Sequence, residues 1–301
     1  MIYTVTLNPA MDCVMQLDDL VPGRTNRASG AFYSAGGKGI NVSRVLRSLG
    51  TDSILTGFLA GFTGMEIERQ LTEQRCKCDF VKLEEGCTRI NVKIKGKEET
   101  EINGTGVKPQ EEEVIRLMRK LEKAEKGDVI VLAGSIPKGL DPKIYEEIMK
   151  NARGKAIDFA VDTEGEALLG TLPYKPFLIK PNNHELGEIF GCEIDTMEKA
   201  AKYGGELQKQ GARNVLVSMA GDGAVLCAED GRTYFQPAAS GKAVNSVGAG
   251  DSMVAGFIAG MNNYKNYRNA LRLGTAAGAA CAFSEGLPEH GDIMNIMDEL
   301  D

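Results

Sequence analysis

Histidines and closely paired cysteines are scarce in this chain, which argues against a zinc cluster. His184 and His290 are the only histidines. The seven cysteines are scattered and odd in number, and Cys76 and Cys78 have a single residue between them, which is too few for a zinc knuckle. Strand-like sequence begins at residue 2, so we expect no secretory leader, reduced thiols and a cytoplasmic protein.

A basic excess and long apolar runs are also missing. The formal net charge is −7 and the pI is near 5.2, so we expect no nucleic acid as a general partner, although a local basic pocket for a phosphorylated metabolite is not excluded. No apolar run is long enough to span a bilayer, and we expect no membrane partner. The 301 residues, 43% hydrophobic and 26% charged, suit one large α/β domain.

Short apolar strands alternate with amphipathic helices, a pattern that predicts a mostly parallel sheet covered by helices on both faces. The expected strands are 128–133, 156–161, 177–179 and 214–218, and 110–126 is an expected helix. Ligands of such sheets bind beyond the carboxyl ends of the strands. Polar and glycine residues follow these strands, so we expect the functional site at that edge.

Two segments depart from this pattern and predict a second, smaller sheet. Residues 88–95 alternate between polar and apolar side chains, and a turn at Gly96-Lys97 leads into 100–103, which is typical of a hairpin with one polar face. A second strand-like pair covers 12–17 and 26–33. The polar face either closes over a cleft as a lid or meets only water.

We therefore expect one domain over residues 1–301, with lid insertions at about 12–34 and 87–106. The apolar face of the hairpin holds Ile90, Val92 and Ile94. It either packs against a partner's lid, which gives a homodimer, or rests on its own subunit.

A turn without bulky side chains, Gly248-Ala249-Gly250, precedes a long apolar segment that is typical of a buried helix, and Asp251 stands where this helix begins. The unpaired N–H groups and the positive dipole end of a helix N-terminus suit a phosphate. Asp251 is then either a base that takes the proton from a hydroxyl attacking a phosphoryl group, or a helix cap. These residues alone leave both interpretations open.

A second glycine-rich turn, Gly36-Gly37-Lys38-Gly39, opens another helix with Asn41 in its first turn. Lys38 is either a mobile positive charge for an anion or an exposed lysine at an ordinary helix start. The turn is not a P-loop, because a glycine follows the lysine, and no complete GxGxxG motif supports a dinucleotide.

Four further groups of residues have two interpretations each. Arg89 either clamps a phosphate or is a solubilising edge charge. Asp12 either binds sugar hydroxyls or caps a turn. Asn182 and Glu185 have the spacing of a capping box, and alternatively organise a hydrated Mg²⁺ near phosphates. The small residues at 218–223 either admit a nucleotide or form a plain glycine turn.

Together, and in this order, these segments resemble those of the ribokinase-like, PfkB-type sugar kinases. The matching segments are Asn8-Pro9-Ala10-Met11-Asp12, Gly36 to Val42, Lys180-Pro181-Asn182 through Glu185, and Gly248-Ala249-Gly250-Asp251. The resemblance implies a three-layer α/β/α core with a mostly parallel sheet and a small β-sheet lid.

The resemblance also implies roles for individual residues. Asp251 would be the base, with the amides of Gly248, Ala249 and Gly250 as the anion hole. Asp12, Gly37 and Asn41 would hold sugar hydroxyls, Lys38, Arg89 and Ser135 the substrate's phosphate, and Asn103 is placed with these substrate residues. Ser218, Gly221 and Gly223 would line the nucleotide site together with Gly248 and Gly250, and Asn182 and Glu185 would bind Mg²⁺.

The activity implied by the resemblance is Mg²⁺- and ATP-dependent phosphorylation of fructose 1-phosphate at its 6-hydroxyl, giving fructose 1,6-bisphosphate. Tagatose 6-phosphate is the alternative acceptor, and a non-catalytic sugar-phosphate sensor is the alternative of another class. Two departures from the family pattern stand out. Asn245-Ser246 replaces the usual Asp-Thr, and residues 103–106 lack a proline often found there.

Overall fold

The continuous apolar runs form the central strands of a ten-stranded sheet in the computed structural model, which describes residues 1–300. The strands of this sheet are β1 (Ile2–Thr6), β4 (Ser53–Ala60), β5 (Lys77–Cys78), β6 (Val81–Leu83), β9 (Val129–Ala133), β10 (Asp158–Asp162), β11 (Leu178–Ile179), β12 (Asn214–Ser218), β13 (Ala224–Cys227) and β14 (Thr233–Gln236). Their order is β14-β13-β12-β11-β10-β9-β1-β4-β5, and β6 also pairs with β4. The antiparallel pairs of this sheet, β12 with β13 and β13 with β14, lie at one edge, and the other strand pairs are parallel.

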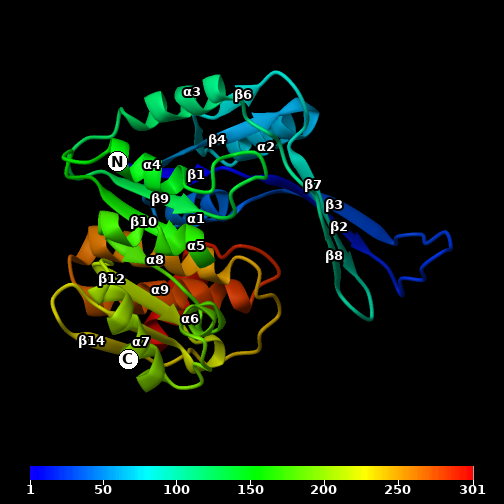
Figure 1. The fold of residues 1–301 in the computed structure, drawn as a ribbon. Coiled ribbons are helices and arrows are strands. Elements are labelled where there is room, and N and C mark those ends of the chain that lie inside the picture. Colours follow the sequence, from blue (N-terminus) through cyan, green and yellow to red (C-terminus); the bar gives the residue numbers. More distant parts are fainter. Residues whose placement is uncertain (301) are drawn as a thin grey trace.

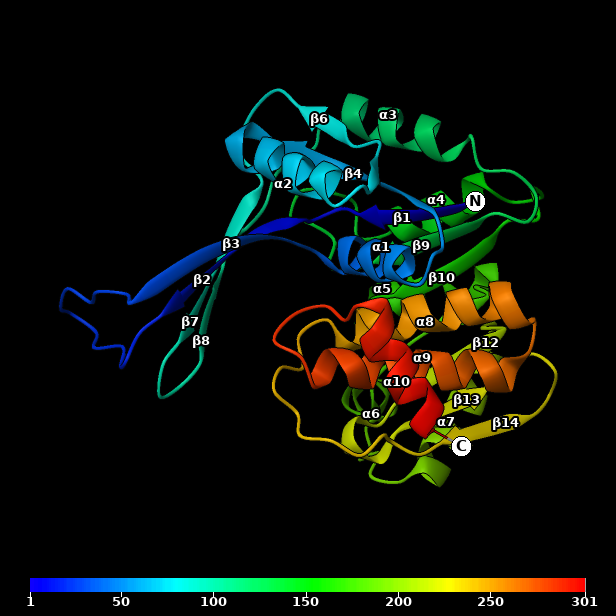
Figure 2. The ribbon, with the colours of Figure 1, turned by 180° about the vertical axis from the view of Figure 1, so that it is seen from behind.

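Helices cover both faces of this sheet, because the central strands carry apolar side chains on both faces. Ile130 and Leu132 pack with α3 (Glu111–Leu121), α4 (Ile144–Asn151), α5 (Gly165–Leu169), α6 (Asn183–Phe190) and α7 (Met197–Lys209). Val131 and Ala133 pack with α1 (Lys38–Ser48), α8 (Ala249–Tyr264), α9 (Tyr267–Ala282) and α10 (His290–Glu299). Figure 1 shows α4, α6 and α7 in front of the sheet, and Figure 2 shows α1, α8 and α10 in front of its other face. The predicted three-layer architecture is confirmed.

A separate four-stranded sheet projects from this body like a blade (Figures 1 and 2). It is made of β3 (Gly30–Gly36), β2 (Ala10–Gln16), β7 (Arg89–Lys95) and β8 (Thr100–Asn103), in that order. We call this sheet the lid. It joins the body beside α2 (Gly61–Glu73), whose Ile67 and Leu71 pack with Met11 and Ala35 at the base of the lid.

Several predicted bounds differ from the observed ones, as when β10 begins at Asp158 and β2 at Ala10. The two largest differences arise where side-chain or turn hydrogen bonds outweigh periodicity. The helix expected over 110–126 ends at Leu121, where Lys123 and Ala124 close tight turns and the backbone N–H of Glu125 bonds to Asp128. The strand expected from residue 26 begins at Gly30, because the Asn26 side chain holds a loop through the backbone of Val21 and Arg24. Within residues 1–300, no helix is both long and apolar enough to cross a membrane.

Candidate active site

Asp251 lies in the first turn of α8, inside the body. The helix N-cap is Gly248, whose φ of 86° lies in the left-handed region that favours glycine. No side chain caps this helix start, so Asp251 does not serve as the N-cap. Instead Asp251 is 6% exposed, and its carboxylate accepts a hydrogen bond of 2.8 Å from the side-chain amide of Asn41.

The surroundings of Asp251 favour its neutral form more than those of an ordinary aspartate. Burial and the nearby negative charge of Asp162 raise its pKa to about 7, against the opposing effects of the Asn41 hydrogen bond and of Lys38 and Lys180. A carboxyl group with such a pKa exchanges its proton readily near neutral pH, as a general base requires.

A buried charge cluster lies beside Asp251, where β10 and β11 end. The Oδ1 atom of Asp162 is 3.4 Å from Nζ of Lys38 and 3.5 Å from Nζ of Lys180. Burial by itself would raise the pKa of Asp162, but the two ammonium groups hold it below its ordinary value. Lys180 is 4% exposed, and a Cβ atom added at Gly250 would stand 3.1 Å from its Nζ. The ammonium group therefore lies directly against the Gly248-Ala249-Gly250 turn.

Sequence analysis assigned no role to Asp162 or Lys180. The available signal was their position, since each is a charged residue that closes or follows a buried apolar strand. Their pairing depends on β10 and β11 being neighbours in the sheet, which periodicity does not reveal.

The predicted phosphate-binding residues line one cavity of about 190 Å³ at the base of the lid. Lys38, Arg89 and Ser135 face it together with Asn8 and Gly37. The guanidinium of Arg89 donates to the backbone carbonyls of Asn8 and Gly104 at 3.2 and 3.4 Å, and the Asn8 amide donates to Ser135 at 3.2 Å. The structure thus brings Lys38, Arg89 and Ser135 together around one cavity. The Arg89 hydrogen bonds also connect the lid to the body at this cavity.

The donor set of this cavity fits an anion. Arg89 Nε is buried and has no hydrogen-bond partner among residues 1–300, and the same holds for the Thr6 hydroxyl, so two potential donors are free. Burial by itself would lower the pKa of the half-exposed Lys38, but the carboxylates of Asp162, Asp251 and Glu185 together raise it above its ordinary value. Lys38 therefore stays charged under ordinary conditions.

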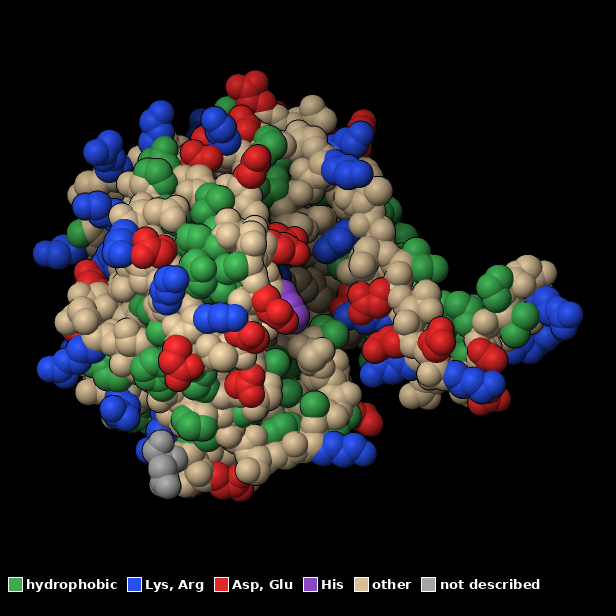
Figure 3. Space-filling model, turned by 60° about the horizontal axis from the view of Figure 1, so that its bottom comes forward, with side chains coloured by type: hydrophobic (Ala, Val, Ile, Leu, Met, Phe, Trp, Pro, Cys, Tyr) green, Lys and Arg blue, Asp and Glu red, His purple; other side chains and the backbone are tan. Residues whose placement is uncertain are grey.

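Asp12 lines a neighbouring cavity of about 200 Å³, which lies between the lid and the body. Asn41 reaches this cavity from α1, and Asn245 and Glu285 reach it from loops beside the start of α8. Asp12 accepts a hydrogen bond of 3.1 Å from Asn91 and forms an ion pair of 3.0 Å with Lys93. Figure 3 shows the molecule hollowed where the lid meets the body, with acidic and basic side chains around the hollow.

Asn103, also predicted to bind substrate, lies apart from these cavity-lining residues. It is exposed on β8, where it pairs with Asn91 across the hairpin, and it lines neither cavity.

Asn182 and Glu185 form the predicted capping box at the start of α6. The Glu185 backbone N–H donates to the Asn182 side chain, and the Asn182 backbone N–H donates to Oε2 of Glu185, both at 2.8 Å. No cluster of three or more potential metal-ligating side chains occurs within residues 1–300. One carboxylate and one amide at a helix start fit only a magnesium ion that keeps most of its water and phosphate ligands.

The predicted nucleotide residues adjoin this capping box. Ser218 forms a parallel β-bridge with Asn182, and the turn after it contains the 3₁₀ helix Ala220–Asp222. Gly223 has a φ of 109°, and a Cβ atom there would lie 2.1 Å from the carbonyl oxygen of Gln236, so the hairpin itself requires this glycine. A Cβ atom at Gly221 would meet nothing within 4 Å, so packing does not require a glycine at that position.

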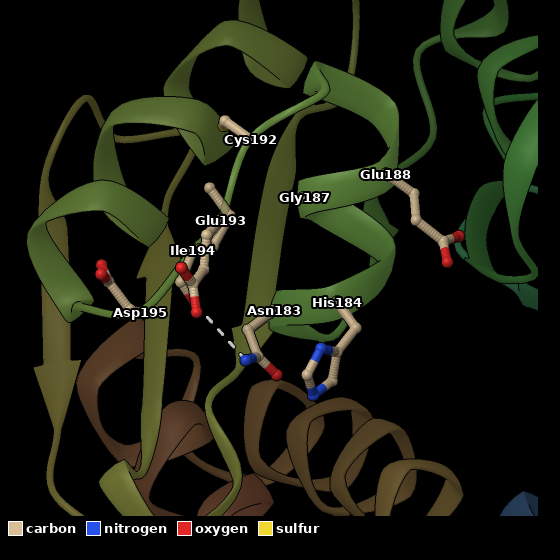
Figure 4. A pocket seen from close by; sticks show the side chains of 8 residues that line it. All are labelled: Asn183, His184, Gly187, Glu188, Cys192, Glu193, Ile194 and Asp195. Carbon is tan, nitrogen blue, oxygen red and sulfur yellow. Dashed lines mark hydrogen bonds between the residues drawn. The ribbon is translucent and has the colours of Figure 1, made fainter.

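A third cavity, of about 460 Å³, lies on the outer side of α6 (Figure 4). It is lined by the start of α6 and by the loop before α7, which the Asn183 amide joins through a 3.3 Å hydrogen bond to the carbonyl of Ile194. In Figure 4, Asn183 and His184 point to one side of the helix and Glu188 points away from them. None of the predicted site residues lines this cavity.

The chain is similar to known carbohydrate kinases over nearly its whole length. The model of the pfkB family of carbohydrate kinases matches residues 5–289. A 1-phosphofructokinase of Bacillus subtilis is 45% identical over 100% of this chain and 98% of the relative. A D-tagatose-1-phosphate kinase of Bacillus licheniformis is 36% identical over 98% of this chain and 96% of the relative.

Among solved structures, phosphofructokinase-2 from Escherichia coli in complex with fructose-6-phosphate superposes with a TM-score of 0.92 at 27% identity, covering 99% of this chain and 98% of the other. Family match, relatives and fold agree along nearly the whole length. The chain belongs to the pfkB family of carbohydrate kinases.

Proposed function

We propose that this carbohydrate kinase transfers a phosphoryl group from ATP to the 6-hydroxyl of fructose 1-phosphate and releases fructose 1,6-bisphosphate. The observation that carries the proposal is the buried Asp251 at the start of α8, which is held at 2.8 Å by Asn41 of the Asp12 cavity and interacts with the charge of Lys38, a lining residue of the phosphate cavity. The 45% identity to a protein named 1-phosphofructokinase supports the choice of acceptor.

In this proposal the substrate's own phosphate binds to Lys38, Arg89 and Ser135. Asp12, Gly37 and Asn41 hold the sugar hydroxyls, and Asn103 contributes from the edge of the lid. The 6-hydroxyl gives its proton to Asp251 as its oxygen attacks the phosphoryl group of ATP.

The amides of Gly248, Ala249 and Gly250 stabilise the charge that develops on the transferring group, and Lys180 lies against the same turn.

On the nucleotide side, Ser218, Gly221 and Gly223 line the ATP site with Gly248 and Gly250. Asn182 and Glu185 would hold a hydrated Mg²⁺, which neutralises phosphate charge when it is bound. The β-bridge between Ser218 and Asn182 supports this arrangement, because it places the proposed nucleotide and metal residues side by side.

The acceptor is tested by measuring ADP release with a panel of phosphorylated hexoses and by identifying the product with ³¹P NMR. We expect the highest kcat/KM with fructose 1-phosphate and a product phosphorylated at carbons 1 and 6. The panel includes tagatose 6-phosphate, the alternative acceptor, and tagatose 1-phosphate, which the name of a 36% identical relative suggests. A higher kcat/KM with either tagatose phosphate would overturn the assignment, and tight binding without ADP release would favour a sensor.

We also propose that residues 1–301 act as one kinase unit with lid insertions at about 12–34 and 87–106, and that two copies pair through their lids. The outer face of the lid exposes Tyr33, Ile90 and Ile102 by 57%, 38% and 59%, whereas Ile94 on the same face is buried. Exposed apolar side chains on one sheet face suit a second apolar surface.

The scattered, odd set of cysteines supports a reducing compartment, the cytoplasm, as the place of action.

A further inference from the structure

Three polar side chains form a compact array on the inner face of the lid. Asp12 on β2 receives a hydrogen bond from Asn91 at 3.1 Å through Oδ1 and faces the Lys93 ammonium at 3.0 Å through Oδ2. The Asp12 and Lys93 side chains are only 15% and 13% exposed, and Asn91 is 8% exposed. Side chains of β7 therefore bind both carboxylate oxygens of Asp12.

Strand pairing produces this array. Asp12 lies opposite Asn91 in the parallel β2–β7 pair, and Lys93 follows two residues later on the same face. On the other side, a Cβ atom at Gly36 of β3 would stand 2.8 Å from Oδ2 of Asp12. Only a glycine at 36 leaves room for the carboxylate in this position.

The array still has unused hydrogen-bonding capacity. The carbonyl oxygen of the Asn91 side chain is buried and has no partner among residues 1–300. Such an atom is costly to leave unpaired, and a hydroxyl donor satisfies it. At the surface of the cavity, the acceptors of Asp12 beside the donor of Lys93 match the donors and acceptors of adjacent sugar hydroxyls.

The two cavities beside the array differ in charge. In the cavity of Arg89, the cations Lys38 and Arg89 face a single carboxylate, Glu164. In the cavity of Asp12, the three cations are matched by three carboxylates. These six are Arg44, Lys93 and Lys95 against Asp12, Glu99 and Glu285. A phosphate is therefore favoured in the first cavity and uncharged hydroxyls in the second.

We propose that Lys93, supported by Asn91, is a specificity-determining residue that fixes the Asp12 carboxylate against the sugar hydroxyls and keeps this end of the cleft neutral. The inference rests on the proposed function, because it assumes a ketohexose phosphate whose phosphate binds at Lys38 and Arg89. Fructose and tagatose differ only in the configuration of the hydroxyl at carbon 4. A rigid hydroxyl-binding array discriminates between them, and a loosened one does not.

The test compares Lys93→Met with wild type in steady-state kinetics on fructose 1-phosphate and tagatose 1-phosphate. We expect the KM for fructose 1-phosphate to rise about tenfold and the KM for ATP to change less than about twofold, because a charge-assisted contact at the sugar end is lost. The ratio of kcat/KM between the two epimers falls towards unity. Lys93→Arg, which keeps the charge, restores most of that ratio.

The matched control is Lys97→Met on the same hairpin. Lys97 also pairs with an aspartate, Asp19, at 3.2 Å, but these side chains are 75% and 54% exposed at the tip of the lid. Removing this exposed pair leaves the kinetics on both epimers unchanged.

Asn91→Leu provides a second variant, independent of the behaviour of Lys93→Met, and its melting temperature is recorded beside that of the wild type. A folded Asn91→Leu protein lowers the epimer ratio in the same direction. An unchanged ratio in folded Lys93→Met or Asn91→Leu protein overturns the inference, as does an equal rise in KM for ATP. Wild-type protein that phosphorylates no ketohexose phosphate would instead reject the proposed function.

Discussion

The side chains of Asn41 and Asp251, 210 residues apart in the sequence, are joined by a hydrogen bond of 2.8 Å. Asn41 follows the first glycine-rich turn at the start of α1, and Asp251 follows the second at the start of α8. This bond joins the cavity proposed for the sugar to the turn proposed for the transferred phosphoryl group. In the proposed reaction, this bond holds Asp251 beside the cavity from which the acceptor hydroxyl would approach.

The first prediction concerns pH. A general base works only in its ionised form, and the pKa of Asp251 is raised to about 7. The kcat/KM for fructose 1-phosphate should therefore fall about tenfold per pH unit below that value and level off above it. The Asn41 hydrogen bond favours the ionised carboxylate, so Asn41→Ala should move the fall to higher pH. A flat profile between pH 5.5 and 8 in the wild type is the contrary result.

The second prediction separates the two substrates. Lys38→Ala and Arg89→Ala should each raise the KM for fructose 1-phosphate by roughly 10- to 100-fold, because each removes a charged donor from the proposed phosphate cavity. The KM for ATP should change by less than about threefold. Arg69→Ala is the control, since Arg69 makes only exposed ion pairs on α2. Equal increases for both substrates would argue against the phosphate assignment.

The third prediction distinguishes a metal role for Glu185 from a purely structural one. Glu185→Gln keeps the capping box, because an amide oxygen also accepts from the Asn182 backbone N–H, and the melting temperature should hold. Loss of the charge should raise the Mg²⁺ concentration needed for half-maximal activity by several-fold. An unchanged Mg²⁺ dependence together with an unchanged melting temperature would leave Glu185 with the capping role alone.

The fourth prediction concerns the lid. Ile102→Glu places a charge on the outer lid face, where this side chain is 59% exposed, and should convert dimers to monomers in light scattering. The control is Ile115→Glu, where the isoleucine is 42% exposed on α3, a helix that lies on the body and not on the projecting lid (Figure 1). A wild-type protein that is already monomeric at all concentrations would rule out pairing through the lid.

Local sequence patterns predicted most of the fold. The strands Asn214–Ser218 and Thr100–Asn103 have the bounds that an apolar run and the hairpin pattern indicated. Periodicity failed where single side chains decide the outcome, as when Asp128 and Asn26 organise turns that shorten a helix and a strand.

Individual residues of the candidate site were easier to predict from the sequence than the contacts between them. Lys38, Arg89 and Ser135 were chosen individually and lie around one cavity. Asp162 and Lys180 were missed, because their contact requires the order of the strands in the sheet. The Asp12–Lys93 pair depends in the same way on β2 lying beside β7. Asp12 and Asn91, which face each other across these strands, are 79 residues apart in the sequence.

Turnover by the Asp251→Asn variant tests the central claim most directly. Asparagine has nearly the same shape and still accepts the hydrogen bond from Asn41, so the fold and the binding of both substrates should persist, as measured by thermal melting and calorimetry. Without a base, kcat for fructose 1-phosphate should fall by roughly a hundredfold to ten-thousandfold. A folded variant that retains a near-normal kcat would show that Asp251 does not take the proton.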